Sequence, residues 1–330
     1  MNAKINRRGF VKSTLLASAA LPLALREQTA TAQESPPSPA DTAPGAAEGM
    51  PMGRIGEEEF SRLILGGNLI GGYAHSRDLP YVSTLVRHYN TPAKIRETLE
   101  LAEAQGINAI NTWLSADNTP IFEHWKNGGK MKIFSQISLD ADGGYSQIDQ
   151  AVDLGAVALH IHGGLADSWL AEKKFEKIGE MVGLMKAKKR LAGVGAHDLR
   201  VIAECEKAGL EADFYQKTLH THDYFSAPGS GDTAACGAHD NSWCSDAQGV
   251  IDVMAKVRKP WIAFKILAAG AIRPETAFPW AFINGADFIL VGMFDWQVAE
   301  DAALARRVVR IVNKPGSKRT RPWYGRSAMG

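Results

Sequence analysis

The sequence has few cysteines, no excess of charge of either sign and no long apolar run, and each shortage narrows its possible functions. Its 330 residues contain 37 Lys and Arg against 36 Asp and Glu, a net charge of +1. The chain therefore lacks the basic surplus that nucleic-acid-binding proteins carry. With 45% hydrophobic residues it can bury a large core. We expect a globular protein that binds a small molecule and no nucleic acid, and the sequence leaves its oligomeric state open.

The apolar stretch near the start is too short and too rich in alanine for a stable membrane span. It reads "NRRGFVKSTLLASAALPLAL", with Arg7 and Arg8 in front, and it resembles a twin-arginine export signal. That resemblance implies a periplasmic or otherwise exported protein that engages the twin-arginine machinery, with an uncleaved membrane anchor as the alternative. We predict a signal peptide over residues 1–32, a disordered Pro/Ala/Gly-rich linker over 33–55 and a catalytic domain over 56–330.

Three cysteines in an exported protein permit one disulfide and one spare thiol. Cys236 and Cys244 share a loop rich in Gly, Ser and Asp, and we expect them to pair. Cys205 lies in "RVIAECEKAGL", whose apolar spacing is helical, so we expect a packed side chain there.

No GxGxxG motif follows the first apolar run, as a dinucleotide-binding open sheet would require. Short apolar runs instead alternate with amphipathic segments, which predicts repeated βα units and a parallel sheet. Eight units in roughly 270 residues is the size of an α/β (β/α)8 TIM barrel, and one domain is enough. The predicted strands are 62–69, 108–114, 132–140, 157–163, 191–198, 213–220, 260–267 and 286–293; helices are predicted within 92–106, 173–189, 246–259 and 273–285.

Polar side chains are expected to point into this barrel, because strand residues alternate between the helix layer and the interior. Val157, Leu159 and Ile161 would face the helices, which sends His160 and His162 inward. In the seventh strand Ile262, Phe264 and Ile266 would face the helices. The other side chains expected inside are Asn68, Asn111, Gln136, Asp140, His197 and Lys265. An interior normally holds branched apolar residues, so this convergence indicates a functional site.

The sixth strand has two possible phases. If Tyr215 and Leu219 face the helices, His220 and His222 point inward and Lys217 points outward. The opposite phase puts Lys217 inside and the histidines among the helices. The choice between the two phases decides which chemistry the strand can support.

The first hypothesis is a divalent metal site. Imidazoles at strand ends with a nearby carboxylate suit Zn, Mn, Fe or Co. The predicted ligands are His162, His197, His220 and His222, with Asp140 as a further ligand or catalytic group. Lys265 would act as a general base or stabilise an enolate. No short metal motif such as HExxH is present.

The second hypothesis rests on a resemblance. "ADFYQKTLHTHDYF" and the later "KPWIAFKILAAGAIRPETAFPWAFINGADFI" are similar to the last strands of deoxyribose-phosphate-aldolase-like barrels. The resemblance covers about the last third of the chain. It implies that Lys217 forms a Schiff base and that Lys265 lowers the pKa of that amine. The segment "RLILGGNLIGGY" resembles the start of aldo-keto reductases, which we interpret as a generic barrel start.

Two connections are longer than a barrel needs, over residues 71–91 and 221–246, and both follow strand ends where barrel active sites lie. In the first, His75 is a candidate for proton transfer, and Tyr73 and Arg77 for substrate binding. In the second, the aromatic ring of Trp243 is a candidate sugar platform. Asn68, Asn111, Gln136 and His160 complete the predicted substrate-binding set.

These patterns favour an exported metal-dependent lyase or isomerase that removes a proton next to a carbonyl in a sugar-derived carbonyl or polyol substrate. Three alternatives remain open: a Schiff-base aldolase that uses Lys217 and Lys265, a metal-dependent hydrolase, and a non-catalytic carbohydrate-binding protein.

Overall fold

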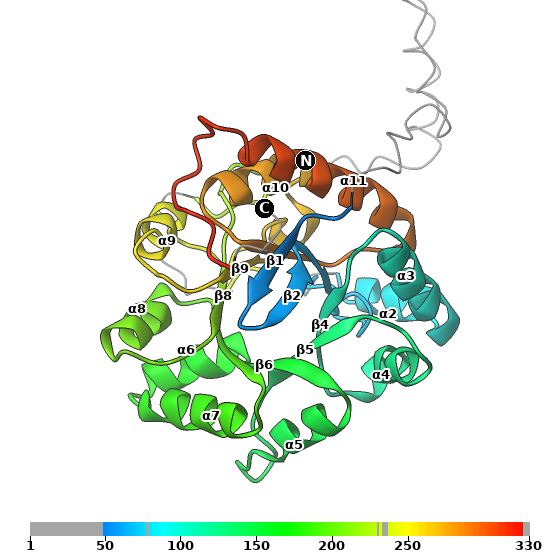
Figure 1. Ribbon diagram of the computed structural model, residues 1–330, viewed down its shortest axis with the longest axis horizontal. Helices are drawn as coiled ribbons and strands as arrows, with labels where there is room; N and C mark the ends of the chain where they lie inside the picture. Colours follow the sequence, from blue (N-terminus) through cyan, green and yellow to red (C-terminus); the bar gives the residue numbers. More distant parts are fainter. Residues whose placement is uncertain (1–48, 77–78, 230, 233–236, 326–330) are drawn as a thin grey trace, which may run out of the picture. The chain divides into compact units, whose positions relative to one another are not determined.

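The computed structural model describes residues 49–76, 79–229, 231–232 and 237–325, and it confirms the predicted barrel (Figure 1). Eight parallel strands close in the order β10-β3-β4-β5-β6-β7-β8-β9, and each overlaps one of the eight predicted runs. They are β3 (Leu63–Gly66), β4 (Ala109–Trp113), β5 (Lys132–Ile137), β6 (Ala156–Ile161), β7 (Leu191–Ala196), β8 (Phe214–Thr218), β9 (Trp261–Phe264) and β10 (Phe288–Val291).

Helices surround the barrel and connect its strands (Figure 1). Their starts follow local chemistry: the side chain of Thr91 accepts a hydrogen bond from the amide of Lys94, and Pro92 takes the first helical position of α3. They are α2 (Tyr81–Tyr89), α3 (Pro92–Ala104), α4 (Thr119–Lys126), α5 (Ser146–Asp153), α6 (Gly163–Ala171), α7 (Glu176–Ala187), α8 (Leu199–Lys207), α9 (Ala247–Met254), α10 (Pro274–Ile283) and α11 (Asp295–Val312).

An antiparallel hairpin, β1 (Met52–Ile55) and β2 (Glu58–Ser61), precedes the barrel and lies across its opening in Figure 1. Ile55 and Phe60 are fully buried in one cluster with residues from the starts of the barrel strands. The hairpin therefore closes the amino-terminal end of the barrel. Residues 52–55 belong to this strand rather than to the linker predicted over 33–55, because the side chain of Ile55 packs into this cluster.

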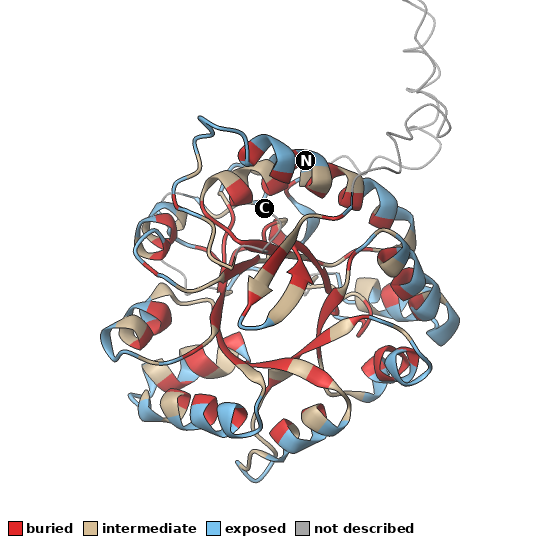
Figure 2. Ribbon diagram, in the orientation of Figure 1, coloured by how far each residue is buried: buried red, intermediate tan, exposed pale blue. Residues whose placement is uncertain are grey.

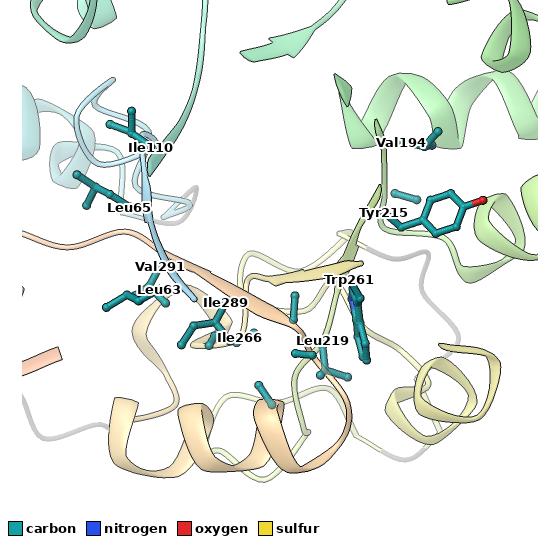
Figure 3. Packing of buried hydrophobic residues seen from close by; sticks show 14 of the residues in the cluster. Leu63, Leu65, Ile110, Val194, Tyr215, Leu219, Trp261, Ile266, Ile289 and Val291 are labelled. Carbon is teal, nitrogen blue, oxygen red and sulfur yellow. The ribbon is translucent and has the colours of Figure 1, made fainter. Parts of the chain in front are cut away.

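The largest core lies between strands and helices, where Figure 2 shows buried residues on the strands and on the inner helix faces. Figure 3 shows the outward strand side chains that form it, among them Leu65, Ile110 and Val194. Inside the barrel a second cluster gathers Phe134, Phe214 and Phe288. Gly193 makes room for Phe214, since a Cβ atom there would lie 2.4 Å from its ring.

In β8 and β9, the sixth and seventh barrel strands along the chain, the structure shows which side chains face the helices and which face the interior. In β8, Tyr215 and Leu219 belong to the outer core, so Lys217 lies on the outward face and His220 on the inward one. In β9 the predicted phase is wrong: Trp261 and Ala263 pack in the outer core, and Ile262 packs inside the barrel. Phe264 lies on that inner face and contacts the ring of His197. The error arose because β9 is apolar on both faces.

Buried charges at the amino-terminal end are paired. Asp287 is fully buried, and its carboxylate accepts hydrogen bonds from the guanidinium of Arg319 at 3.0 Å and from the amide of Trp261. Arg321 lies 3.6 Å from the same carboxylate. The carbonyl of Gly325 accepts a hydrogen bond from the amide of Arg54 in β1. Residues 319–325 thus link the hairpin to the amino-terminal end of the barrel, which we call its floor.

No helix in the described part of the chain is long and apolar enough to cross a membrane. The thiols of Cys205 and Cys244 are buried, and burial raises the pKa of both. The predicted partner of Cys244, Cys236, lies outside the described residues, as do the predicted signal peptide and Arg77. The disulfide, the export route and the role of Arg77 stay predictions.

Candidate active site at the carboxyl ends of the strands

A polar layer fills the barrel above the phenylalanine cluster. Asn111, His160 and Gln216 are all buried there. Nδ1 of His160 lies 3.1 Å from the carbonyl of Ile161, which can only accept, so His160 carries its proton on Nδ1. Nε2 then accepts a hydrogen bond from the amide of Asn111, which also donates to Gln216. Burial lowers the pKa of His160 to about 4, so the ring is neutral at pH 7.

Lys265 reaches the mouth of the barrel by a route that strand alternation does not predict. The phase of β9 would point Lys265 outward, but its backbone φ of 57° ends the strand in a left-handed conformation. Its ammonium Nζ lies 2.8 Å from Nε2 of His75, which has a φ of 48°. Left-handed backbone at residues other than glycine costs free energy and concentrates at functional sites. Two such residues therefore meet through their side chains.

Aromatic and amide groups surround this lysine–histidine pair. The indole of Trp243 lies under the ammonium of Lys265, 3.9 Å from Nζ to the ring centroid, and packs against the His75 ring. The ring of Tyr73 also packs edge-on against the ring of His75. The amide of Asn68 lies 3.1 Å from Nε2 of His75, so two donors share this one ring nitrogen. Three predicted site residues from the two long loops, Tyr73, His75 and Trp243, thus meet around Lys265 together with Asn68, which follows β3.

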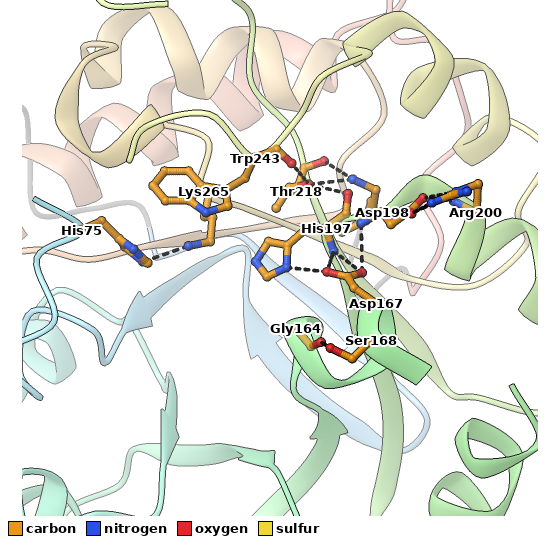
Figure 4. A network of polar contacts seen from close by, with 11 residues as sticks. His75, Gly164, Asp167, Ser168, His197, Asp198, Arg200, Thr218, Trp243 and Lys265 are labelled. Carbon is orange, nitrogen blue, oxygen red and sulfur yellow. Dashed lines mark hydrogen bonds and ion pairs between the residues drawn. The ribbon is translucent and has the colours of Figure 1, made fainter. Parts of the chain in front are cut away.

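His197, at the end of β7, forms a dyad with Asp167 of α6. Nδ1 of His197 donates to the carboxylate at 2.8 Å, and the same carboxylate accepts from the amides of His197 and Asp198. Figure 4 shows the imidazole between Asp167 and Lys265. A Cβ on Gly163 would lie 3.0 Å from the imidazole, so glycine leaves room for the ring.

Burial lowers the pKa of His197, the hydrogen bond to Asp167 raises it, and the charge on Lys265 lowers it, with a net lowering. A neutral imidazole whose Nδ1 donates to a carboxylate carries its lone pair on Nε2. The arrangement is that of a general base held by a carboxylate.

Sequence reasoning missed Asp167 and Thr218. Asp167 lies 30 residues from His197 and becomes its neighbour only because α6 returns against β7, so its sole sequence signal was a carboxylate one turn into a helix that begins with two glycines. The hydroxyl of Thr218 donates to the carbonyl of Trp243. Nothing in the sequence marked this threonine, since threonine is common in strands.

The predicted metal ligands lie in two pairs, His162 within electrostatic reach of His197 and His220 beside His222, with 5.8 Å between the latter two ring centroids. No group of three or more His, Cys, Asp or Glu side chains within the described ranges is arranged to hold a metal ion. His162 and His222 are exposed. Nε2 of His220 accepts a hydrogen bond from the amide of Trp243, and its Nδ1 lies 2.9 Å from the carbonyl of Thr221. These side-chain positions do not fit the predicted metal, and we derive no chemical step from one.

The remaining candidates lie apart from the mouth or beneath it. Lys217 is 1% exposed on the outward face of β8, and its ammonium donates to the hydroxyl and carbonyl of Thr218. The carboxylate of Asp140 accepts a hydrogen bond from the amide of Ser146 within its own loop. Gln136 pairs in register with His160 between β5 and β6, at the level of the polar layer.

Comparison with known proteins supports the fold. No protein-family model matches the chain, and no curated protein matches its sequence. A putative aldo-keto reductase of Pseudomonas aeruginosa aligns with a TM-score of 0.52 at 15% identity, over 78% of this chain and 94% of its own. An aldo-keto reductase of Bacillus halodurans gives 0.53 at 11% identity, over 82% and 99%.

A structure described as an aldolase aligns with a TM-score of 0.39 at 16% identity, over 68% of this chain and 92% of its own, which is too weak to support an argument. The identities to the two reductases are low, so these likenesses show the barrel fold alone. The chain shares its fold with enzymes, and its reaction must be argued from its own side chains.

Proposed function

We propose that the mouth of the barrel is the active site of a lyase or isomerase that removes a proton next to a carbonyl. The observation that carries the proposal is the His197–Asp167 dyad, 2.8 Å between Nδ1 and the carboxylate, within electrostatic reach of Lys265. Barrel enzymes place their catalytic groups at this end. The dyad supplies a base and the lysine supplies a cation, which are the two groups that enolisation requires.

The base step uses the neutral form of His197. Nε2 takes the proton from the carbon next to the carbonyl, and the electron pair of that C–H bond becomes the enolate. Asp167 holds the ring in the correct tautomer and stabilises the imidazolium that forms. In an isomerisation of an α-hydroxy carbonyl compound, the proton of the adjacent hydroxyl passes to the enolate oxygen, the imidazolium returns its proton to the former carbonyl carbon, and the adjacent carbon becomes the new carbonyl. In an elimination, the enolate expels a leaving group that takes the proton from the imidazolium, and the carbonyl is restored.

Lys265 stabilises the negative charge on the enolate oxygen. Its ammonium is held by the ring nitrogen of His75 and by the face of Trp243. The amide of Asn68 is placed to bind the substrate on the same side. These polar and aromatic groups support a sugar-derived carbonyl compound as substrate. No chemical step in this proposal uses the divalent metal that the sequence predicts, and elemental analysis of the purified protein tests for one.

The test is exchange of the substrate proton with solvent. We would incubate the purified protein in D2O with a panel of aldo- and keto-sugars and sugar acids and follow deuterium incorporation next to the carbonyl by NMR. Exchange that is lost in the His197→Gln variant supports the proposal. Turnover without exchange would contradict it and would point to hydrolysis, and binding without turnover would point to a carbohydrate-binding protein.

Borohydride reduction in the same mixtures separates the proposal from the Schiff-base aldolase. A covalent adduct located on Lys265 or Lys217 by mass spectrometry would favour the aldolase. The outward position of Lys217 makes Lys265 the better placed of the two amines, because its Nζ lies at the mouth beside His75.

A further inference from the structure

Trp243 is held at both polar atoms of its main chain by the end of β8. Its amide donates a hydrogen bond of 2.9 Å to Nε2 of His220. Its carbonyl accepts one of 2.7 Å from the hydroxyl of Thr218. His220 and Thr218 are fully buried and Trp243 is 6% exposed, so water does not compete for these bonds. The two bonds join residues 23 and 25 positions apart in the chain.

We call the hydrogen bonds from Thr218 and His220 to the main chain of Trp243 the clamp. Which group donates and which accepts in each bond follows from the protons that the groups carry. The ammonium of Lys217 can only donate, and it lies 2.6 Å from the hydroxyl of Thr218. The single proton of that hydroxyl is therefore donated to a carbonyl, and that of Trp243 at 2.7 Å is nearer than that of His197 at 3.4 Å. Nδ1 of His220 must donate to the carbonyl of Thr221, which leaves Nε2 as the acceptor for the amide of Trp243. No member of the clamp can reverse its role.

The clamp matters because of what the indole of Trp243 touches. The ring lies 3.9 Å from Nζ of Lys265 and 4.6 Å from the ring of His75, measured to centroids. Figure 4 shows Trp243 beside both Lys265 and Thr218. The end of β8 thus supports one wall of the site, and Lys265, from the end of β9, lies against that wall.

We propose that His220 and Thr218 are positioning residues that fix the main chain of Trp243, so that its indole covers the amine of Lys265 and the ring of His75. Lys217 orients the hydroxyl of Thr218 in this arrangement. The inference thus gives a supporting role to His220, which the sequence suggests as a metal ligand, and to Lys217, which it suggests as a Schiff-base lysine. It does not rest on the proposed reaction, because the position of the indole can be measured without a substrate.

The experiment measures how open the amine of Lys265 is to a reagent. Purified variants are treated briefly with an amine-acetylating reagent, and the rate at Lys265 is read by mass spectrometry. His220→Phe removes the acceptor at similar volume, and Thr218→Val removes the hydroxyl at constant shape. We expect each to raise acetylation of Lys265 about fivefold, the factor that one lost hydrogen bond represents.

Conservative variants provide the rescue. His220→Gln keeps an acceptor near the position of Nε2 and Thr218→Ser keeps the hydroxyl, so we expect both to stay close to the wild-type rate. His239→Gln is the matched control, since His239 belongs to the same loop and its exposed ring pairs with Asp232. The indole N–H resonance of Trp243, assigned from its loss in Trp243→Phe, should shift in His220→Phe and Thr218→Val and stay in place in the control.

The acetylation rates of Lys265 in the two variants and the indole N–H resonance of Trp243 test the proposal for each residue separately. Unchanged acetylation of Lys265 and an unshifted indole resonance in folded Thr218→Val would overturn the proposal for Thr218, and the same result in His220→Phe would overturn it for His220. If His220→Phe does not fold, His220→Asn takes its place, because the shorter amide leaves the Trp243 amide without its acceptor.

Discussion

The two ends of the barrel are built from opposite kinds of polar chemistry. At the amino-terminal end the buried charge of Asp287 is matched by Arg319 and Arg321, beneath a hairpin whose side chains fill the opening. At the carboxyl end Lys265 contacts the neutral ring of His75 and the face of Trp243. Compensated charge and apolar filling stabilise a fold, whereas cations beside neutral imidazoles are available for chemistry.

Backbone geometry repeats the contrast. Lys265 and His75 both have positive φ values at the mouth, and the adjoining turn adds Ala268 and Ala269. In the hairpin that closes the floor, the positive φ falls on Gly56, which adopts it without strain. Left-handed backbone at residues other than glycine thus surrounds the end where we place the reaction, and at the opposite end it occurs at Lys189, with a φ of 55° in the turn before β7.

If the carboxyl end of the barrel carries the chemistry and the amino-terminal end stabilises the fold, the largest effect of a substitution should be on catalysis at the carboxyl end. His197→Gln should lower kcat by about 10²- to 10⁴-fold, the usual contribution of a general base, with little change in stability. His88→Gln, an exposed histidine on α2, is the control. Equal kinetics of the two variants in steady-state assays on the substrate found by exchange would contradict the division.

The floor should respond in the opposite way. Asp287→Asn leaves two buried guanidinium groups without their counter-charge, and we expect the free energy of unfolding to fall by about 3 to 5 kcal/mol. The kcat per folded molecule should be unchanged. Urea denaturation measures the loss, and Glu172→Gln, which breaks an exposed pair with Lys174, should have no measurable effect.

Acid should destabilise the protein through the mouth. The folded-state pKa values of His160 and His220 are lowered by burial from 6.5 to about 4. Their neutral forms are favoured in the folded state, so this stability is complete above the unfolded pKa and is lost as the pH falls from about 6.5 towards 4. Between pH 7 and pH 5 each should cost about 2 kcal/mol.

Urea midpoints at the two pH values measure that loss, and a folded His160→Gln variant should show about half the pH dependence of the wild type. A pH dependence that survives replacement of both histidines would mean that other groups, such as His197, dominate the acid response.

The smallest effect is expected at Lys217. Lys217 lies on the outward face of β8, and its ammonium contacts the hydroxyl of Thr218. Lys217→Met should therefore lower kcat about fivefold or less, the value of one hydrogen bond. A Schiff-base nucleophile could not be replaced in this way. Complete loss of turnover in a folded Lys217→Met protein would therefore favour the aldolase.

The fold was readable from the sequence because eight apolar runs at regular spacing admit few architectures. The polar interior was readable as well, since Asn111 and His160 stand out among apolar neighbours. The phase of β9 was not, because alternating side chains of equal hydrophobicity carry no signal. The direction of Lys265 depends on a positive φ that no sequence pattern announces, and Asp167 joins His197 only through packing of α6 on β7.

The hydrogen exchange rate of the substrate proton in the Asp167→Asn variant tests the central claim most directly. An asparagine keeps the size of the side chain but cannot stabilise an imidazolium, so exchange into D2O should slow by at least about tenfold while the urea midpoint changes little. Exchange at the wild-type rate in a folded Asp167→Asn protein would contradict the dyad, and with it the assignment of the reaction to this end of the barrel.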